Sequence, residues 1–171
     1  AQADTTTYTG TGTLRKSGAG ELHWYYNGAS SVGTFAMDSG GLIEVKAGVM
    51  APRWGSDEVF TNNLADLDIE SGATFRNVNS GVRVNKLTGA GRLESGWHTG
   101  TVSFVVGVDN GTSTFVRALH DSGLGSSPGK LTFIKEGTGT LTLTNSSTYS
   151  GDLNVRGGTV TVTSAGLISG I

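Results

Sequence analysis

The sequence predicts an all-β protein, a right-handed parallel β-helix, from its composition, its internal repeats and the alternation of its apolar residues. Among 171 residues there are 28 glycines and only two prolines, and charged residues make up just 15%. Such a chain is poor in strong helix formers, while its many threonines and valines suit a pleated surface. The length fits one folding unit, so we expect residues 1–171 to form a single β-helix domain.

Internal repeats are the strongest of these observations. Three segments align, each with a short strand, a Gly-x-Gly corner and a second strand, namely Leu14–Leu22, Asn85–Leu93 and Phe133–Leu141. The intervals between their first corner glycines are close to three times and two times a common step. This spacing predicts a solenoid of about seven coils, each about 24 residues long.

Between the repeats, several short segments alternate apolar and polar residues, as in 41–45, 67–75, 102–106 and 158–162. Alternation at period two places one face of a strand in the core and the other in water. We expect Phe35, Phe75, Phe104 and Phe133 to lie in the core.

An antiparallel sandwich is the alternative fold. It requires hairpin turns between most strands, for which Asn27-Gly28 and Asn110-Gly111 are candidates. A sandwich does not account for a near-constant period along the chain, so the β-helix is preferred.

Charge and hydropathy exclude several classes of function. The formal net charge is -2 and the basic residues are scattered, so we expect no nucleic-acid partner. No apolar run approaches the ~18 residues of a membrane span, so we expect no membrane insertion. The three histidines have no close metal-binding spacing, and no serine lies in a nucleophile-elbow pattern.

Acidic residues gather in two places, the pair Asp57-Glu58 and the alternating set Asp66, Asp68 and Glu70. The alternating set is expected on one outer strand face, which is also how an ordinary solvated strand looks. Polysaccharide hydrolases and lyases use carboxylates, so such an enzyme is a third alternative, but we expect no catalytic activity. No cofactor is predicted, although calcium near Asp57-Glu58 or Asp109-Asn110-Gly111 is an open alternative.

The stretch from Lys135 to Thr144, with its continuation from Thr148 to Val160, resembles the passenger-associated repeat of bacterial autotransporters. The resemblance is good over this stretch, with partial echoes at Gly89–Leu93 and Tyr8-Thr9-Gly10. It implies a parallel β-helix on a secreted or surface-displayed protein. By architecture, the chain is also similar to the β-helix xylan-binding modules of carbohydrate-binding module family eighty-nine.

Aromatic residues outside the strand pattern suggest where a glycan would bind. Sugar rings pack on aromatic faces, and their hydroxyl groups need polar partners nearby. Tyr26 and Trp97 both lie at the same offset after a reference glycine, and one period later come the segments containing Trp54 and His120. We therefore predict a ligand-binding strip along one edge, formed by Trp54, Trp97, Tyr25, Tyr26, His23, His98, His120, Arg53, Asp57, Glu58 and Asp121.

These observations favour a non-catalytic, extracellular or cell-surface carbohydrate-binding module. Its expected partner is a plant cell-wall polysaccharide, with xylan preferred, and a fused glycoside hydrolase domain fits such a module. The alternative is a structural or adhesive segment of an autotransporter passenger domain.

Overall fold

In a computed structural model of the chain, the structure describes residues 7–24, 34–52, 60–78, 81–96, 100–121 and 129–163, with the side chain of residue 24 excluded. These ranges contain eighteen β-strands and no α-helix. None of the described residues forms a helix long and apolar enough to cross a membrane. The strand pairings are parallel throughout these ranges, so the predicted all-β class with parallel sheets is confirmed and the antiparallel sandwich is wrong.

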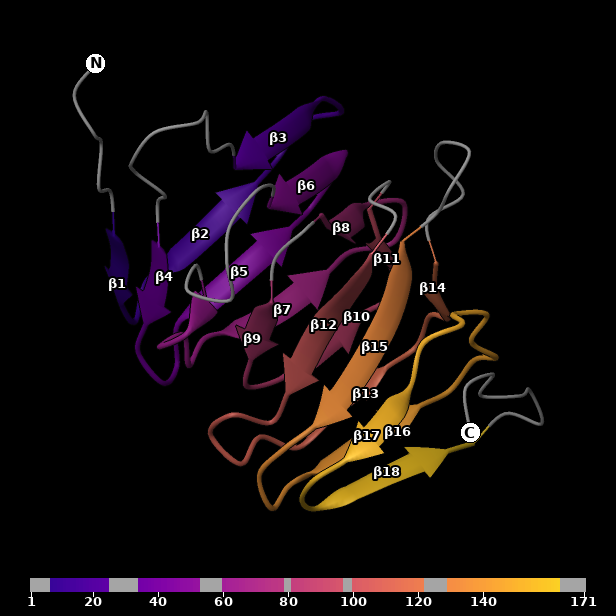
Figure 1. Cartoon of the computed structure of the whole chain (residues 1–171). Helices are drawn as coiled ribbons and strands as arrows, with labels where there is room; N and C mark the ends of the chain where they lie inside the picture. Colours follow the sequence, from indigo (N-terminus) through magenta and orange to yellow (C-terminus); the bar gives the residue numbers. More distant parts are fainter. Residues whose placement is uncertain are drawn as a thin grey trace.

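The strands form three long stacks (Figure 1). The first sheet has the order β18-β16-β13-β10-β7-β5-β2. Its strands are β2 (Thr13–Lys16), β5 (Leu42–Val45), β7 (Asp66–Ile69), β10 (Leu87–Gly89), β13 (Ser113–Phe115), β16 (Thr140–Leu143) and β18 (Thr159–Val162).

The second sheet has the order β14-β11-β8-β6-β3, and the third has the order β17-β15-β12-β9. The second sheet contains β3 (Glu21–Trp24), β6 (Val49–Pro52), β8 (Thr74–Asn77), β11 (Arg92–Ser95) and β14 (Leu119–His120). The third contains β9 (Val82–Val84), β12 (Thr101–Val106), β15 (Lys130–Lys135) and β17 (Leu153–Val155). A two-stranded sheet pairs β1 (Thr7–Gly10) with β4 (Thr34–Met37).

The chain passes through the sheets in one repeating order, although the described residues contribute no third-sheet strand between β6 and β7 and no second-sheet strand between β16 and β17. From β10 in the first sheet it passes to β11 in the second, to β12 in the third, and back to β13 in the first (Figure 1). Each strand therefore pairs with the strand reached one circuit later, as a solenoid requires.

A continuous hydrophobic core fills the space between the sheets. The four phenylalanines predicted there are confirmed as buried. Phe104 lies between Phe75 and Phe133, with ring centroids 6.1 and 5.7 Å away, and Phe35 stacks on Phe60 at 4.6 Å. Phe104 and Phe133 are stacked in one row of the third sheet, and Phe75 meets Phe104 edge-on from the second sheet. The three rings form a column with Phe104 in the middle, in which each ring contributes apolar burial and favourable ring–ring contact.

The predicted alignment of the first two repeats is right after the corner, where Leu22 and Leu93 share a row of the second sheet. Before the corner it is wrong by two residues, because Leu14 shares a row of the first sheet with Leu87 and not with Asn85.

The alignment of the third repeat is wrong. The corner at Gly18 leads from the first sheet to the second, as does the corner after β10. The corner at Gly137 instead follows β15 of the third sheet and leads to the first. The interval from Gly89 to Gly137 therefore does not correspond to two whole circuits of the solenoid.

Circuit length also varies more than predicted. In the first sheet a long circuit separates the partners Thr13 and Leu42, whereas a much shorter one separates Thr140 and Thr159. Six pairings lead from Thr13 to Thr159, which gives an average of about 24 residues, an ordinary length for a solenoid coil. The average agrees with the prediction, but the near-constant period is wrong, because the segments between strands differ in length.

Replacing Phe104 by Ala is expected to lower the free energy of unfolding by about 3–5 kcal/mol, because it removes the middle ring of a column and leaves a cavity. Chemical denaturation followed by far-UV circular dichroism measures this change. The control is Val116→Ala beside β13, where 41% of the side chain is exposed and the expected change is below about 0.5 kcal/mol. Equal effects of the two substitutions would contradict this account of the core.

Candidate functional site

The outer face of the second sheet carries a row of polar side chains. Strand register places His23, Ala51, Arg76, Glu94 and His120 in this row, one from each strand from β3 to β14. Two of the residues expected in the strip, His23 and His120, thus lie in one row, at opposite edges of the sheet. Glu94 was not singled out by sequence reasoning, because its partner Arg76 lies on another coil.

Charges at the centre of this row are paired and nearly buried. The Nε of Arg76 donates to Glu94 Oε1 at 2.7 Å, and its Nη1 lies 3.1 Å from Glu21 Oε1. Arg92 Nε lies 2.5 Å from the second oxygen of Glu94. The hydrogen bond from Arg76 holds the pKa of Glu21 below its usual value. This arrangement binds successive coils together and leaves Glu94 poorly placed to act as a general base.

His120 borders a shallow depression of 310 Å³ together with Arg117, Ala118, Asn145 and Ser146. Its Nδ1 is 2.9 Å from Thr148 Oγ1 on the next coil. Burial, followed by the positive charges of Arg92 and Arg117, lowers the pKa of His120, which favours the neutral imidazole. The positive charge of the exposed Arg117 beside it disfavours a metal cation, so this depression suits hydrogen bonding to a polar ligand better than metal binding.

The other described residues of the predicted strip have local partners. His23 Nε2 lies 2.8 Å from Glu21 Oε2 on the same strand. The two oxygens of Asp121 accept backbone N–H groups from Leu131 at 2.9 Å and Ser150 at 2.8 Å. Asp121 therefore fixes two segments of backbone.

The remaining residues predicted for the strip lie outside the described residues, namely Tyr25, Tyr26, Arg53, Trp54, Asp57, Glu58, Trp97 and His98. In chain order, the segments that carry them each follow a strand of the second sheet. The preceding strands also keep the predicted offset, because Trp24 pairs with Pro52 and Leu22 shares a row with Leu93. Whether these residues contact a ligand stays a prediction.

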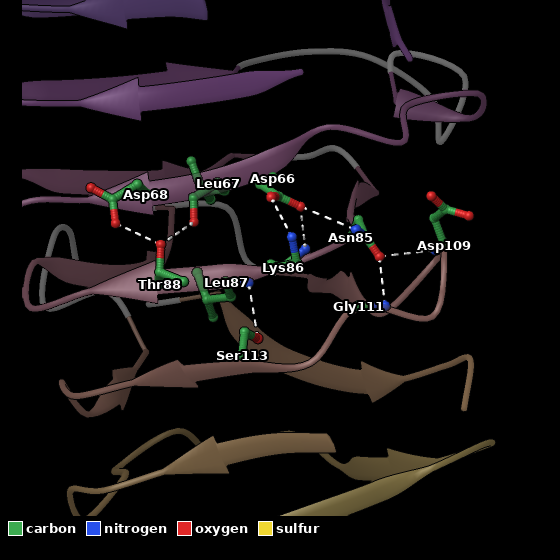
Figure 2. A network of polar contacts seen from close by, with 10 residues as sticks. All are labelled: Asp66, Leu67, Asp68, Asn85, Lys86, Leu87, Thr88, Asp109, Gly111 and Ser113. Carbon is green, nitrogen blue, oxygen red and sulfur yellow. Dashed lines mark hydrogen bonds and ion pairs between the residues drawn. The ribbon is translucent and has the colours of Figure 1, made fainter. Parts of the chain in front are cut away.

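The acidic set Asp66, Asp68 and Glu70 lies on the outer face of β7, as predicted, while Leu67 and Ile69 are buried between them. Lys86 Nζ is 3.0 Å from Asp66, and Thr88 donates to Asp68 at 2.6 Å (Figure 2). Lys46 pairs with Glu70, so each of the three carboxylates has a partner.

Glu44, Asp68 and Glu70 bring three carboxylates close together on the first sheet. Lys46 pairs with both Glu44 and Glu70, and Arg15 pairs with Glu44. Hydrogen bonds from Arg15 and Lys46 lower the pKa of Glu44, and those to Glu70 and Glu44 raise the pKa of Lys46. Two cations of the chain thus pair with Glu44 and Glu70, whereas Asp68 receives a hydrogen bond from Thr88. The row continues beyond Asp68 as threonines, namely Thr88, Thr114, Thr142 and Thr161.

The corner Asp109-Asn110-Gly111, the other alternative for calcium, is organised by Asn85. Asn85 Oδ1 accepts the N–H groups of Asp109 at 3.2 Å and Gly111 at 2.7 Å, and its Nδ2 donates to Asp66 Oδ1 at 3.1 Å (Figure 2). Asn110 has a positive φ of 62° and accepts a hydrogen bond from Thr138 N at 3.0 Å. These contacts join successive coils through the amide side chains of the corner.

Two buried lysines secure corners in a way that sequence reasoning missed. Lys16 Nζ donates to the carbonyls of Gly18 at 2.7 Å and Ala47 at 2.9 Å. Lys135, fully buried, donates to Glu136 and, at longer range, to Gly157 at 3.5 Å. Each ammonium group thus links carbonyl groups of its own corner to a carbonyl group of the corner on the next coil. Burial lowers the pKa of Lys135.

Both lysine corners share the pattern Lys-x-Gly-x-Gly, which is the signal that could have revealed them. Each also requires a glycine on the next coil. A Cβ at Gly48 would lie 2.4 Å from the Gly20 carbonyl oxygen, and one at Gly158 would lie 2.2 Å from that of Gly139. The same local device therefore occurs at two different corners of the solenoid.

Comparison with known proteins identifies one stretch of the chain. A family model described as passenger-associated-transport-repeat matches residues 133–162. This stretch begins inside β15, includes the Lys135 corner and ends with β18. No curated protein and no solved structure matched the chain. The predicted resemblance to the autotransporter passenger repeat is thus supported for these residues, whereas a likeness to the xylan-binding modules is not shown.

Replacing Lys135 by Met is expected to lower the free energy of unfolding by about 1–3 kcal/mol, because buried corner carbonyls lose their donor while side-chain volume is kept. The matched control is Lys130→Met at the exposed start of the same strand, where the change should stay below about 0.5 kcal/mol. Urea denaturation measures both. A Lys135→Met variant as stable as the unsubstituted chain would show that the ammonium group contributes nothing.

Proposed function

We propose that this chain is a non-catalytic structural segment of a bacterial autotransporter passenger, displayed at an outer surface. The observation that carries the proposal is the match of residues 133–162 to the passenger-associated-transport-repeat. In this chain the matched stretch has a structural task. It contains the buried lysine corner and two adjacent strand pairings, β15 with β17 and β16 with β18.

The pairing of the carboxylates supports a non-catalytic role for the chain. The carboxylates on the outer faces of the first and second sheets form ion pairs or hydrogen bonds with neighbouring strands. A general acid or base needs a free face toward the substrate, and a pair of catalytic carboxylates needs different environments. The described carboxylates instead serve the stacking of coils.

The proposal includes the finer architecture. Parallel strands joined by crossovers in one sheet are right-handed in about 98% of known cases, so a right-handed β-helix of about seven coils over residues 1–171 is the form that we propose. Such a rod suits display, because its length grows by repetition while each coil contacts only its neighbours.

A second candidate is a carbohydrate-binding module for a plant polysaccharide such as xylan, with a catalytic domain elsewhere in the protein. It is favoured by one observation. The segments that carry Tyr25, Tyr26, Trp54, Trp97 and His98 all follow strands of the same sheet.

Surface display is tested with the full-length protein in the bacterium that produces it. An epitope tag inserted between Asp38 and Gly40, an exposed turn, should be removed when protease is added to intact cells, while a periplasmic marker stays protected. The expected result is loss of the tag without lysis. A tag that is cleaved only after the cells are opened would overturn the display proposal.

Glycan binding is tested by affinity gel electrophoresis of the chain in gels containing soluble xylan. The module proposal expects retarded migration, and the double substitution Trp54→Ala with Trp97→Ala should abolish it while the circular dichroism spectrum is retained. Gels without polysaccharide provide the mobility control. Migration unchanged by xylan would reject this second candidate and leave the display proposal intact.

A further inference from the structure

The outer face of the third sheet contains a depression of 340 Å³ that the proposed function does not use. Its volume lies at the small end of the range of about 300–1,000 Å³ typical of small-molecule sites. It is lined by residues from three neighbouring strands, β9, β12 and β15, and by one residue just before β9 and one just after β17, namely Gly81, Arg83, Ser103, Val105, Ile134 and Arg156.

Aliphatic side chains form the floor of this depression. Register places Arg83, Val105, Ile134 and Asn154 in one outward row, next to the inward row that contains both Phe104 and Phe133. Outward positions of a sheet are normally polar, yet Val105 and Ile134 are 4% and 7% exposed. The floor is therefore an apolar strip enclosed by longer side chains.

Two arginines form the rim, and a single carboxylate lies between them. Arg83 Nη2 reaches across one intervening strand to Glu136 Oε2 at 2.8 Å, and Arg156 Nη1 lies 3.4 Å from Glu136 Oε1. The three groups together carry one net positive charge. The Arg156 side chain is 61% exposed and its contact is long, so most of its donors face solvent.

This arrangement indicates the chemistry of a ligand. Guanidinium groups bind carboxylates in a planar, bidentate manner, and the position of Glu136 shows that the gap between these two arginines accommodates a carboxylate. The aliphatic floor suits the C–H face of a sugar ring, and Ser103 offers a hydroxyl to pair with those of a sugar. Among the described residues that line it, none has an aromatic ring on which a nucleobase would stack.

We propose that this depression is a binding site for a carboxylate-bearing oligosaccharide, with Arg83 and Arg156 binding the uronate group and Val105 and Ile134 supporting the sugar ring. Arg83 lies outside the matched repeat, whereas Glu136 and Arg156 lie inside it. The site therefore forms only because the coil that carries Arg83 lies close to the matched repeat. It stands independently of surface display.

Isothermal titration with tetragalacturonate at low ionic strength tests the site, with the whole chain as the protein. Arg156→Gln and Arg83→Gln are each expected to weaken binding about tenfold, as loss of a charge-assisted contact implies. Glu136→Gln is expected to strengthen binding several-fold, because it removes the competing carboxylate. Lys130→Gln is the matched control, since it removes one positive charge from the same strand outside the depression, and it should change the affinity less than twofold.

Two further ligands separate the chemical classes. Xylotetraose, which is neutral, should not bind at this site, and sulfated maltotetraose should bind more weakly than the uronate. Circular dichroism of each variant verifies that the fold is retained. The proposal is overturned if tetragalacturonate does not bind, if Lys130→Gln weakens binding as much as Arg156→Gln, or if the sulfated sugar binds more tightly.

Discussion

Each coil of this protein lies one strand spacing, about 4.8 Å, above the previous one, and the rest of the structure follows from this constraint. A side chain on any strand has fixed neighbours above and below it in the same row. Inside the solenoid, the constraint stacks Phe104 on Phe133 in one row of the third sheet. On the outer faces it requires charges to alternate or to be diluted by threonine, because like charges at this distance repel. The row through Arg76 and Glu94 meets this requirement by alternation. In the first sheet Glu44 and Asp68 are direct neighbours of like charge, and Arg15 on one side and Thr88 on the other offset their repulsion.

Corners meet the same constraint with backbone atoms. Where two corners stack, their carbonyl groups approach closely and lose access to water, so they need donors. The chain supplies these donors as ammonium groups at Lys16 and Lys135, while the Asn85 side chain accepts the N–H groups of its neighbouring corner. A lysine is costly to bury, and its burial is offset here by several carbonyl acceptors around one nitrogen. Stacked corners, as much as the core, define which coil lies next to which.

Much of the fold could be predicted from the sequence because period-two alternation and Gly-x-Gly corners are local signals. The parallel all-β architecture and the buried phenylalanines were accessible in this way. The phase of the third repeat was not, because Gly18 and Gly137 share a local corner device that serves two different corners. The prediction stepped one average period along the chain from the Trp97 corner and so placed His120 beside that corner. The actual circuit from β11 to β14 is longer, and His120 pairs with Glu94 on a strand. The Arg83–Glu136 pair joins two strands far apart in the sequence and leaves no local pattern to detect.

The variation in circuit length has a consequence for how such a protein changes over evolutionary time. Short strands keep their rows, while the segments between them absorb the difference between a long circuit, as from Thr13 to Leu42, and a short one, as from Thr140 to Thr159. An insertion or deletion at a corner therefore leaves the core and the register of later coils unchanged. Selection can therefore alter the length and chemistry of the exposed segments one at a time. Each altered sequence along the way still folds, and the same scaffold acquires new recognition surfaces.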